Sequence, residues 1–161
     1  MTKNNVADDV FDISSLDSVD ESRMTVAVNG KLTDWVWVFA GPGHPQTVEQ
    51  SDRISKERLH REHQQEQARV NGRKWKAPDE TADEVLDRNV RIVAERLLDW
   101  YRADSSGRRT ERPILLNGEP YPFSRENAVA LLKDRRKGAL LIQALEFLGD
   151  EAAFSKRSET A

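Results

Sequence analysis

The sequence predicts an α+β domain in which an N-terminal β-hairpin packs on a mostly helical core of about four helices. Two observations predict this class. An Asn29-Gly30 pair separates two runs rich in β-branched and aromatic residues, and four later segments have the caps and residue spacing of helices. At 161 residues the chain fits one domain with one modest core. We expect that domain over residues 23–154, with a flexible acidic segment at 1–22 and a flexible tail at 155–161.

The composition narrows the classes of function. Hydrophobic residues make up 37% of the chain and charged residues 33%, so much of the sequence is expected to be solvated helix surface or disorder. The absence of cysteine excludes a disulfide framework and a thiolate metal site. The N-terminus lacks a signal-peptide pattern, and no apolar run reaches the roughly 18 residues of a membrane span. A soluble intracellular protein is therefore expected.

Charge is unevenly distributed along the chain. Residues 1–22 hold one Lys against five Asp and one Glu, and their few apolar residues are compatible with a short strand near Val10 to Ile13. Residues 49–76 hold eight Lys or Arg against five Asp or Glu. This basic surplus is small and interleaved with acids, whereas a nucleic-acid-binding domain usually has a strongly basic footprint. Binding of nucleic acid is therefore disfavoured.

The hairpin is the strongest local prediction. Asn29 and Gly30 supply the positive φ angles of a type I′ turn, which pairs Val28 with Lys31. This register places Trp35, Trp37 and Phe39 on one face together with Met24, Val26, Val28 and Thr33. Burying the aromatic face could supply on the order of 10 kcal/mol, so we expect it to lie against helices or a partner. Gly41 and Pro42, followed by Gly43-His44-Pro45, end the second strand, because this run disfavours both a ladder and a helix.

A charged helix is predicted over residues 47–70, with Ser51 as a plausible N-cap. From Ser51 to Val70 its apolar residues are only Ile54, Leu59, Ala68 and Val70. So thin a stripe gives little tertiary burial, and we expect the helix to project, fray or await a partner. The residues that we expect to bind a partner are Ile54, Arg58 and Leu59 on this helix and Arg73 and Trp75 in the loop that follows.

The next helix is expected to run from a capping box at Thr81 and Glu84 to about Tyr101, as the central core helix. Its main apolar stripe is Leu86, Val90, Val93, Leu97 and Trp100. Residues 102–113 form a polar, charged loop that we expect to have little order of its own.

A second tight turn is predicted at Asn117-Gly118, where Pro120 and Pro122 restrict the flanking pairing to a short or edge ladder. Phe123 follows as an apolar anchor. Ser124 then caps a helix that contains Ala128, Leu131 and Leu132. After a bend near Lys137-Gly138, a last amphipathic helix ends at Gly149, which is expected in the C′ position. The tail beyond it is polar except for Phe154.

Three arrangements of side chains have both a chemical and a structural interpretation. His60 and His63 have helical spacing with Glu57, Glu62 and Glu66, as a metal site would, but a solvated helix face explains them better. His44 could be displayed as a general base, yet it has no partnering motif and is better explained as a loop-bracing residue. Arg73-Lys74-Trp75-Lys76 could stack on single strands, although packing of Trp75 on the adjacent helix is favoured. We therefore predict no catalytic, metal-binding or cofactor-binding residue and no enzyme.

The order of these motifs resembles a tail assembly chaperone family of long-tailed bacteriophages and prophages. The resemblance covers about Arg23 to Phe154. It is carried by the segments GPGHP at 41–45, NGRKW at 71–75, LDW at 98–100 and NGEPYPFSREN at 117–127. This chain differs in its longer polar segment between Trp100 and Asn117.

The resemblance implies a small protein of the host cytoplasm that binds the tape measure protein and keeps it soluble while tail tube protein subunits assemble around it. Such a protein is absent from the mature virion, needs no cofactor and has no catalytic residues to transfer. Two alternatives remain from the sequence. One is a minor virion component, such as a head or tail connector, and the other is a small nucleic-acid-binding regulator that uses the region from Arg69 to Lys76.

Overall fold

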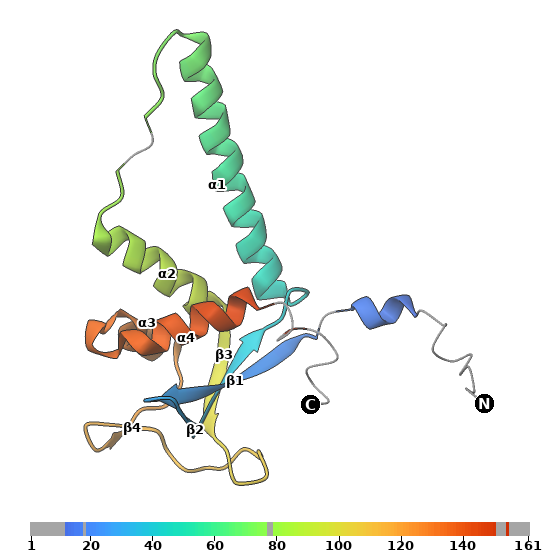
Figure 1. Ribbon diagram of the computed structural model, residues 1–161, viewed down its shortest axis with the longest axis vertical. Coiled ribbons are helices and arrows are strands. Elements are labelled where there is room, and N and C mark those ends of the chain that lie inside the picture. Colours follow the sequence, from blue (N-terminus) through green and yellow to red (C-terminus); the bar gives the residue numbers. More distant parts are fainter. Residues whose placement is uncertain (1–11, 18, 77–78, 151–153, 155–161) are drawn as a thin grey trace, which may run out of the picture.

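The computed structural model describes residues 12–17, 19–76, 79–150 and 154, and over these residues it has the expected α+β architecture (Figure 1). The elements in chain order are η2 (Ile13–Leu16), β1 (Glu21–Val28), β2 (Lys31–Ala40), α1 (Pro45–Val70), α2 (Ala82–Arg96), β3 (Leu97–Arg102), β4 (Leu115–Leu116), β5 (Glu119–Pro120), α3 (Arg125–Lys133), η3 (Arg135–Lys137) and α4 (Gly138–Gly149). Strands β1, β2 and β3 form an antiparallel sheet in that order, and β4 pairs with β5. The first sheet packs against α2, α3 and α4, while α1 projects away from it.

The hairpin confirms the predicted turn and register. Asn29 and Gly30 have φ angles of 52° and 78°, as a type I′ turn requires, and Val28 pairs with Lys31. A bulge between Thr25 and Ala27 shifts the later pairing by two residues, so that Met24 faces Trp37. Because side chains alternate with a period of two, this shift leaves the paired residues on their predicted faces.

The predicted aromatic face of the sheet is buried against helices. Trp37 and Phe39 are fully buried, and Trp35 packs beside them. The rings of Trp35 and Trp37 meet edge to face at 5.4 Å, and Trp37 stacks on Trp100 at 5.8 Å. The helix residues buried in the same core are Val90, Val93, Ala94, Ala128, Leu131, Leu132, Leu140, Leu141 and Ala144.

The predicted helix over residues 81–101 is wrong in its second part. Thr81 caps α2 as expected, its side chain accepting a hydrogen bond from the Glu84 N–H at 3.2 Å. The helix ends at Arg96, however, and Leu97–Arg102 form the third strand of the sheet. Trp100 thus reaches the core from a strand, where it pairs with Trp37. The edge of β2 that does not pair with β1 forms its backbone hydrogen bonds with this apolar segment.

Helix α1 begins six residues before the predicted cap at Ser51. Pro45 is its first residue, and His44 is the N-cap, with Nδ1 accepting from the Gln46 N–H at 3.2 Å. Proline at this position loses nothing, because the first turn of a helix has no partner for that N–H. The expectation that the run from Gly41 to Pro45 excludes a helix is therefore wrong for Pro45, whereas the role of His44 as a bracing residue fits.

The domain begins before residue 23. Strand β1 starts at Glu21, Val19 is buried, and the backbone N–H of Val19 donates to the carbonyl of Phe154 at 3.0 Å. Gly41 makes this packing feasible, since an added Cβ there would lie 1.8 Å from the Val19 carbonyl oxygen. Ile13 lies in a 3₁₀ turn, not in a strand, and Val10 is outside the described residues.

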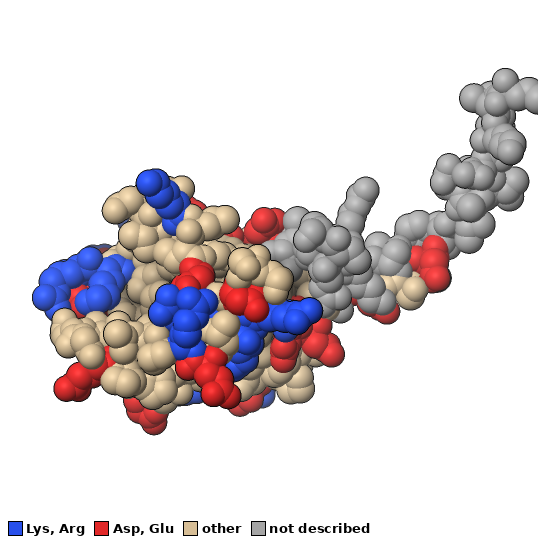
Figure 2. Space-filling view, turned by 90° about the horizontal axis from the view of Figure 1, so that it is seen from below, with Lys and Arg blue, Asp and Glu red and all other residues tan. Residues whose placement is uncertain are grey.

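The polar loop over 102–113 is ordered, contrary to expectation. Asp104 accepts hydrogen bonds from the backbone N–H groups of Ser106 and Arg108 at 2.9 Å each, which closes a tight turn. Arg102 makes a bidentate ion pair with Asp34 across the β2–β3 ladder. Figure 2 views this end of the molecule and shows positive and negative side chains interspersed over it. Asp34 and Asp104 thus each hold neighbouring donors in place.

The remaining C-terminal predictions are confirmed in outline. Asn117 and Gly118 have φ angles of 51° and 83°, and the ladder they join is only two residue pairs long. Ser124 caps α3, accepting from the Asn127 N–H at 3.0 Å. Helix α4 ends at Gly149, but Gly149 is its last helical residue and Asp150 is the C-cap, so the C′ assignment is wrong. Residues 155–161 lie outside the described part.

Side chains cap the outer edges of the sheet at two points. On β1, the Gln143 amide from α4 accepts from the Ala27 N–H and donates to the Ala27 carbonyl, both at 2.8 Å. On β3, the Asp99 carboxylate accepts from the Trp100 N–H at 2.8 Å and pairs with Arg109 at 2.5 Å. Such caps protect edge strands from pairing with other chains.

Candidate functional site

The candidate site is a projecting arm, defined as residues 54–76. It consists of the exposed part of α1 and the segment that turns back towards α2 (Figure 1). Every residue from Ile54 to Val70 is exposed except Ala68, which is half-buried. The 26 residues of α1 span about 39 Å, so most of this helix lies clear of the body. The fold thus leaves a long stretch of α1 with little internal packing.

A polar cluster fixes the base of the arm to α2. Gln50 is buried, and its side-chain N–H donates to the Ile92 carbonyl at 3.1 Å and to Glu95 at 3.0 Å. Arg53 pairs with Glu95 at 2.7 Å, and Arg91 pairs with its other oxygen at 2.8 Å. Burial acts to raise the pKa of the Glu95 carboxyl, but these hydrogen bonds outweigh it and hold the pKa below its ordinary value. The arm therefore leaves the body in a fixed direction.

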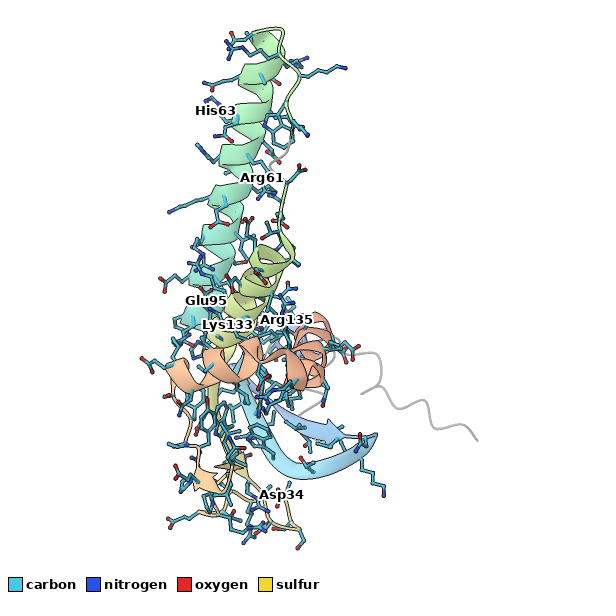
Figure 3. The ribbon with its side chains drawn as sticks, turned by 90° about the vertical axis from the view of Figure 1, so that its left-hand side faces the viewer. Asp34, Arg61, His63, Glu95, Lys133 and Arg135 are labelled. Carbon is cyan, nitrogen blue, oxygen red and sulfur yellow. The ribbon has the colours of Figure 1, made fainter. Side chains whose placement is uncertain are left out.

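The five predicted partner-binding residues do not form one patch. Ile54 and Arg58 are about one turn apart and share a face of α1. Leu59 is rotated by about 140° from Ile54 around the helix axis. Leu59 is instead aligned with Val70, since 11 residues make about three turns. Figure 3 shows that α1 carries side chains on opposite sides, as Arg61 and His63 illustrate. Ile54, Leu59 and Val70 are exposed by 45%, 59% and 74%.

The structure does bring Arg73 and Trp75 together, at the far end of the arm. They line an open hollow of about 550 Å³ with four residues of α1: Glu62, Gln65, Glu66 and Arg69. Trp75 is half-buried there, which agrees with packing of its ring on the adjacent helix. The four helical residues have the i, i+3, i+4, i+7 spacing of one helix face. The sequence favoured packing of Trp75 on the adjacent helix but did not indicate which residues of that helix it would lie beside.

The arm is the positive part of an acidic chain. It holds seven Lys or Arg against three Glu, a net charge of +4, while the whole chain has −3, so all other residues together carry −7. Two of its ion pairs are internal: Arg58 with Glu62 at 3.9 Å and Arg69 with Glu66 at 2.6 Å. Both are exposed pairs, which contribute little to stability. The surface charge of the arm is therefore available to a partner.

Two other hollows are smaller and more integrated into the body. One of about 190 Å³ lies at the base of the arm and is lined by polar residues that include Gln50, Arg53 and Glu95. The other, of about 420 Å³, lies beside β3 between Trp100, Tyr121 and the Arg109–Pro113 segment. Their lining side chains already hold one another: Tyr121 stacks on Trp100 at 6.1 Å, and Phe123 meets Trp100 edge to face at 5.1 Å. These hollows are best explained as by-products of packing.

The described residues contain no group of three or more His, Cys, Asp or Glu side chains placed to hold a metal ion. His60 is exposed, with Nε2 at 3.2 Å from the Gln64 side-chain nitrogen, and His63 is exposed on the same helix. Of the residues assigned structural roles, Pro42, Pro122 and the two turn pairs Asn29-Gly30 and Asn117-Gly118 are exposed. No helix among the described residues is long and apolar enough to cross a membrane.

Comparisons with protein-family models, curated proteins and solved structures give no match for this chain.

Proposed function

We propose that this chain is a non-catalytic assembly chaperone of a phage or prophage tail. In this proposal it acts in the host cytoplasm, binds the tape measure protein and keeps it soluble while tail tube protein assembles, and it is absent from the mature virion. The order of motifs from Arg23 to Phe154 supports the link to tail assembly. The observation that carries a binding role is the arm, a long helix that the fold anchors at one end and leaves uncovered along the rest.

The exposed apolar residues of the arm suit a partner that presents its own apolar helices. Ile54 and Leu59 lie on different faces, so a partner that covers both must wrap around the helix. A rigid base with an adaptable, mixed polar and apolar surface is suited to binding that is later released.

Co-expression with the tape measure protein of the same phage or prophage tests the proposal. The wild-type chain is expected to raise the soluble fraction of that protein and to elute with it on gel filtration. A variant with Ile54→Asp and Leu59→Asp is expected to lose both effects while its own unfolding stays unchanged, because both side chains are exposed. Leu32→Asp with Ile142→Asp is the matched control, since these apolar residues are exposed by 76% and 58% on the body.

Two results would contradict the proposal. In one, the wild-type chain leaves the tape measure protein insoluble and elutes alone. In the other, the control variant loses as much as the arm variant. Mass spectrometry of purified particles separates the main alternative, because a minor virion component would be retained in them.

A further inference from the structure

The far end of the arm combines one aromatic ring with unpaired cations. Trp75 lies in the hollow of about 550 Å³, with Arg69 and Arg73 on its rim. Among the described residues no carboxylate forms an ion pair with Arg61, Arg73, Lys74 or Lys76. The two carboxylates that line this hollow, those of Glu62 and Glu66, both belong to α1. A half-buried ring beside free cations is a surface that contacts both an apolar and an anionic group.

We propose that this tip, residues 62–76, binds an acidic segment of the partner that carries one apolar side chain. The apolar side chain fills the hollow against Trp75, and the acidic groups pair with Arg73, Lys74 and Lys76. The inference deepens the proposed function and rests on it for the role of the partner. It assigns the tip a recognition step of its own, distinct from the apolar contacts of Ile54 and Leu59.

Charge complementarity decides which partner the tip accepts. The arm carries +4 on a chain whose remaining residues carry −7, so an acidic partner is attracted to the arm and repelled by the body. A partner approaching by this route is therefore guided to the end of α1, away from the sheet. The separation between the tip and the body also favours binding. At ionic strengths near 0.15 M, interactions between exposed charges are largely screened beyond about 8 Å, so the negative charge of the body does not oppose binding of an acidic partner at the tip.

A peptide carboxylate suits this site better than a nucleic-acid backbone. Glu62 and Glu66 line the hollow itself, and they would lie against the closely spaced phosphates of a single strand. An extended acidic peptide can place an apolar residue between its charges, whereas a phosphodiester backbone carries a charge at every nucleotide. A single aromatic ring also provides only one stacking platform, where strand-binding proteins use several.

The test is a titration of the full-length protein, observed through the indole N–H signal of Trp75 in a proton–nitrogen NMR spectrum. Trp75→Phe assigns that signal among the four tryptophans. The probes are a short peptide of Asp and Glu with one central Leu, the same peptide with Lys in place of the acids, and oligothymidylate. We expect saturable shifts of the Trp75 signal with the acidic peptide alone, weakening as salt is added.

Charge reversal at the tip locates the binding. Arg73→Glu with Lys74→Glu is expected to weaken binding of the acidic peptide by about tenfold or more. Lys31→Glu with Arg108→Glu is the matched control, because both residues are exposed on the body and the change in net charge is the same. Equal weakening by both variants, absence of a saturable shift, or tighter binding of oligothymidylate than of the peptide would each overturn the inference.

The co-expression assay separates this inference from the proposed function. If the wild-type chain solubilises the tape measure protein and the Arg73→Glu, Lys74→Glu variant does so equally well, the chaperone role stands and the tip proposal fails. If the wild-type chain has no effect on that protein while the peptide titration succeeds, the tip is a recognition site and the proposed role is wrong.

Discussion

Replacing Gln143 with Met should loosen the edge of the sheet with little change in side-chain volume. The Gln143 amide makes two hydrogen bonds to the backbone of Ala27, each 2.8 Å long, from a position on α4 that is remote in sequence. A typical net contribution of about 0.5–1.5 kcal/mol per hydrogen bond predicts a loss of about 1–3 kcal/mol in the free energy of unfolding. For a chain of this size that corresponds to about 2–4 °C in Tm for each kcal/mol.

Urea denaturation followed by tryptophan fluorescence measures the loss, and hydrogen exchange at the Ala27 amide locates it. Gln67→Met on the exposed arm is the control and should leave both unchanged. Gln143→Glu keeps the acceptor for the Ala27 N–H but opposes an anionic oxygen to the Ala27 carbonyl. Its deficit should shrink below about pH 4, where the protonated carboxyl can donate again. An unchanged urea midpoint and unchanged exchange at Ala27 in the Met variant would refute the reasoning.

Three further predictions concern the N-terminal junction, the β2–β3 ladder and the arm. Gly41→Ala should lower the free energy of unfolding by on the order of 3 kcal/mol, because the new Cβ would clash with the Val19 carbonyl. Gly138→Ala is the control and should not destabilise the protein, because its Cβ would lie in open space. Chemical denaturation compares the two variants. The hydrogen bond from Arg102 holds the pKa of the Asp34 carboxyl below its ordinary 3.8, so its contribution to stability is complete above that pH and is lost as the pH falls through the lower folded value. Asp34→Asn should therefore unfold at a lower temperature than wild type near pH 7 and converge with it in strong acid, and a constant difference across the pH range would contradict this. Leu59→Pro should reduce the helical circular dichroism signal, because proline breaks the arm helix. It should change the free energy of unfolding measured by tryptophan fluorescence by less than about 0.5 kcal/mol. A larger change would mean that the arm contributes to the stability of the core.

Local signals were sufficient at both Asn-Gly turns and at two helix caps, although they misplaced the start of α1 at Ser51 and the C′ position at Gly149. Asn-Gly pairs adopted positive φ at both predicted turns, and Thr81 and Ser124 capped the predicted helices. These outcomes depend on groups within a few residues of one another, so neighbouring sequence is enough to determine them.

The segment from Leu97 to Arg102 shows where local signals fail. Its apolar residues continue the spacing of the preceding helix, and over so short a stretch the same residues also suit a buried strand. The choice depended on the free edge of β2, which lies some sixty residues away in sequence and pairs with Trp100 and Tyr101. The order of the 102–113 loop has the same origin, because it depends on Asp34 in β2 as the ion-pair partner of Arg102.

For the candidate site as well, some features could be predicted from the sequence and others could not. The sparse apolar stripe after Ser51 was sufficient to predict an exposed helix, and Ile54, Arg58 and Leu59 are indeed exposed. Helical rotation places Leu59 on a different face of α1 from Ile54 and Arg58. The hollow around Trp75 could not be predicted, since it depends on the path by which the chain returns from α1 to α2.

By itself the sequence determined the α+β class, both Asn-Gly turns, the buried aromatic face and the exposure of the charged helix, because each follows from local backbone preference or from apolar periodicity. Only the tertiary structure decided that Trp100 enters the core from a third strand, that Gln143 closes the edge of β1, and that Trp75 meets Arg69 at the tip of the arm. Those contacts join residues distant along the chain, and their free energy exists only once the folded backbone has brought the partners together.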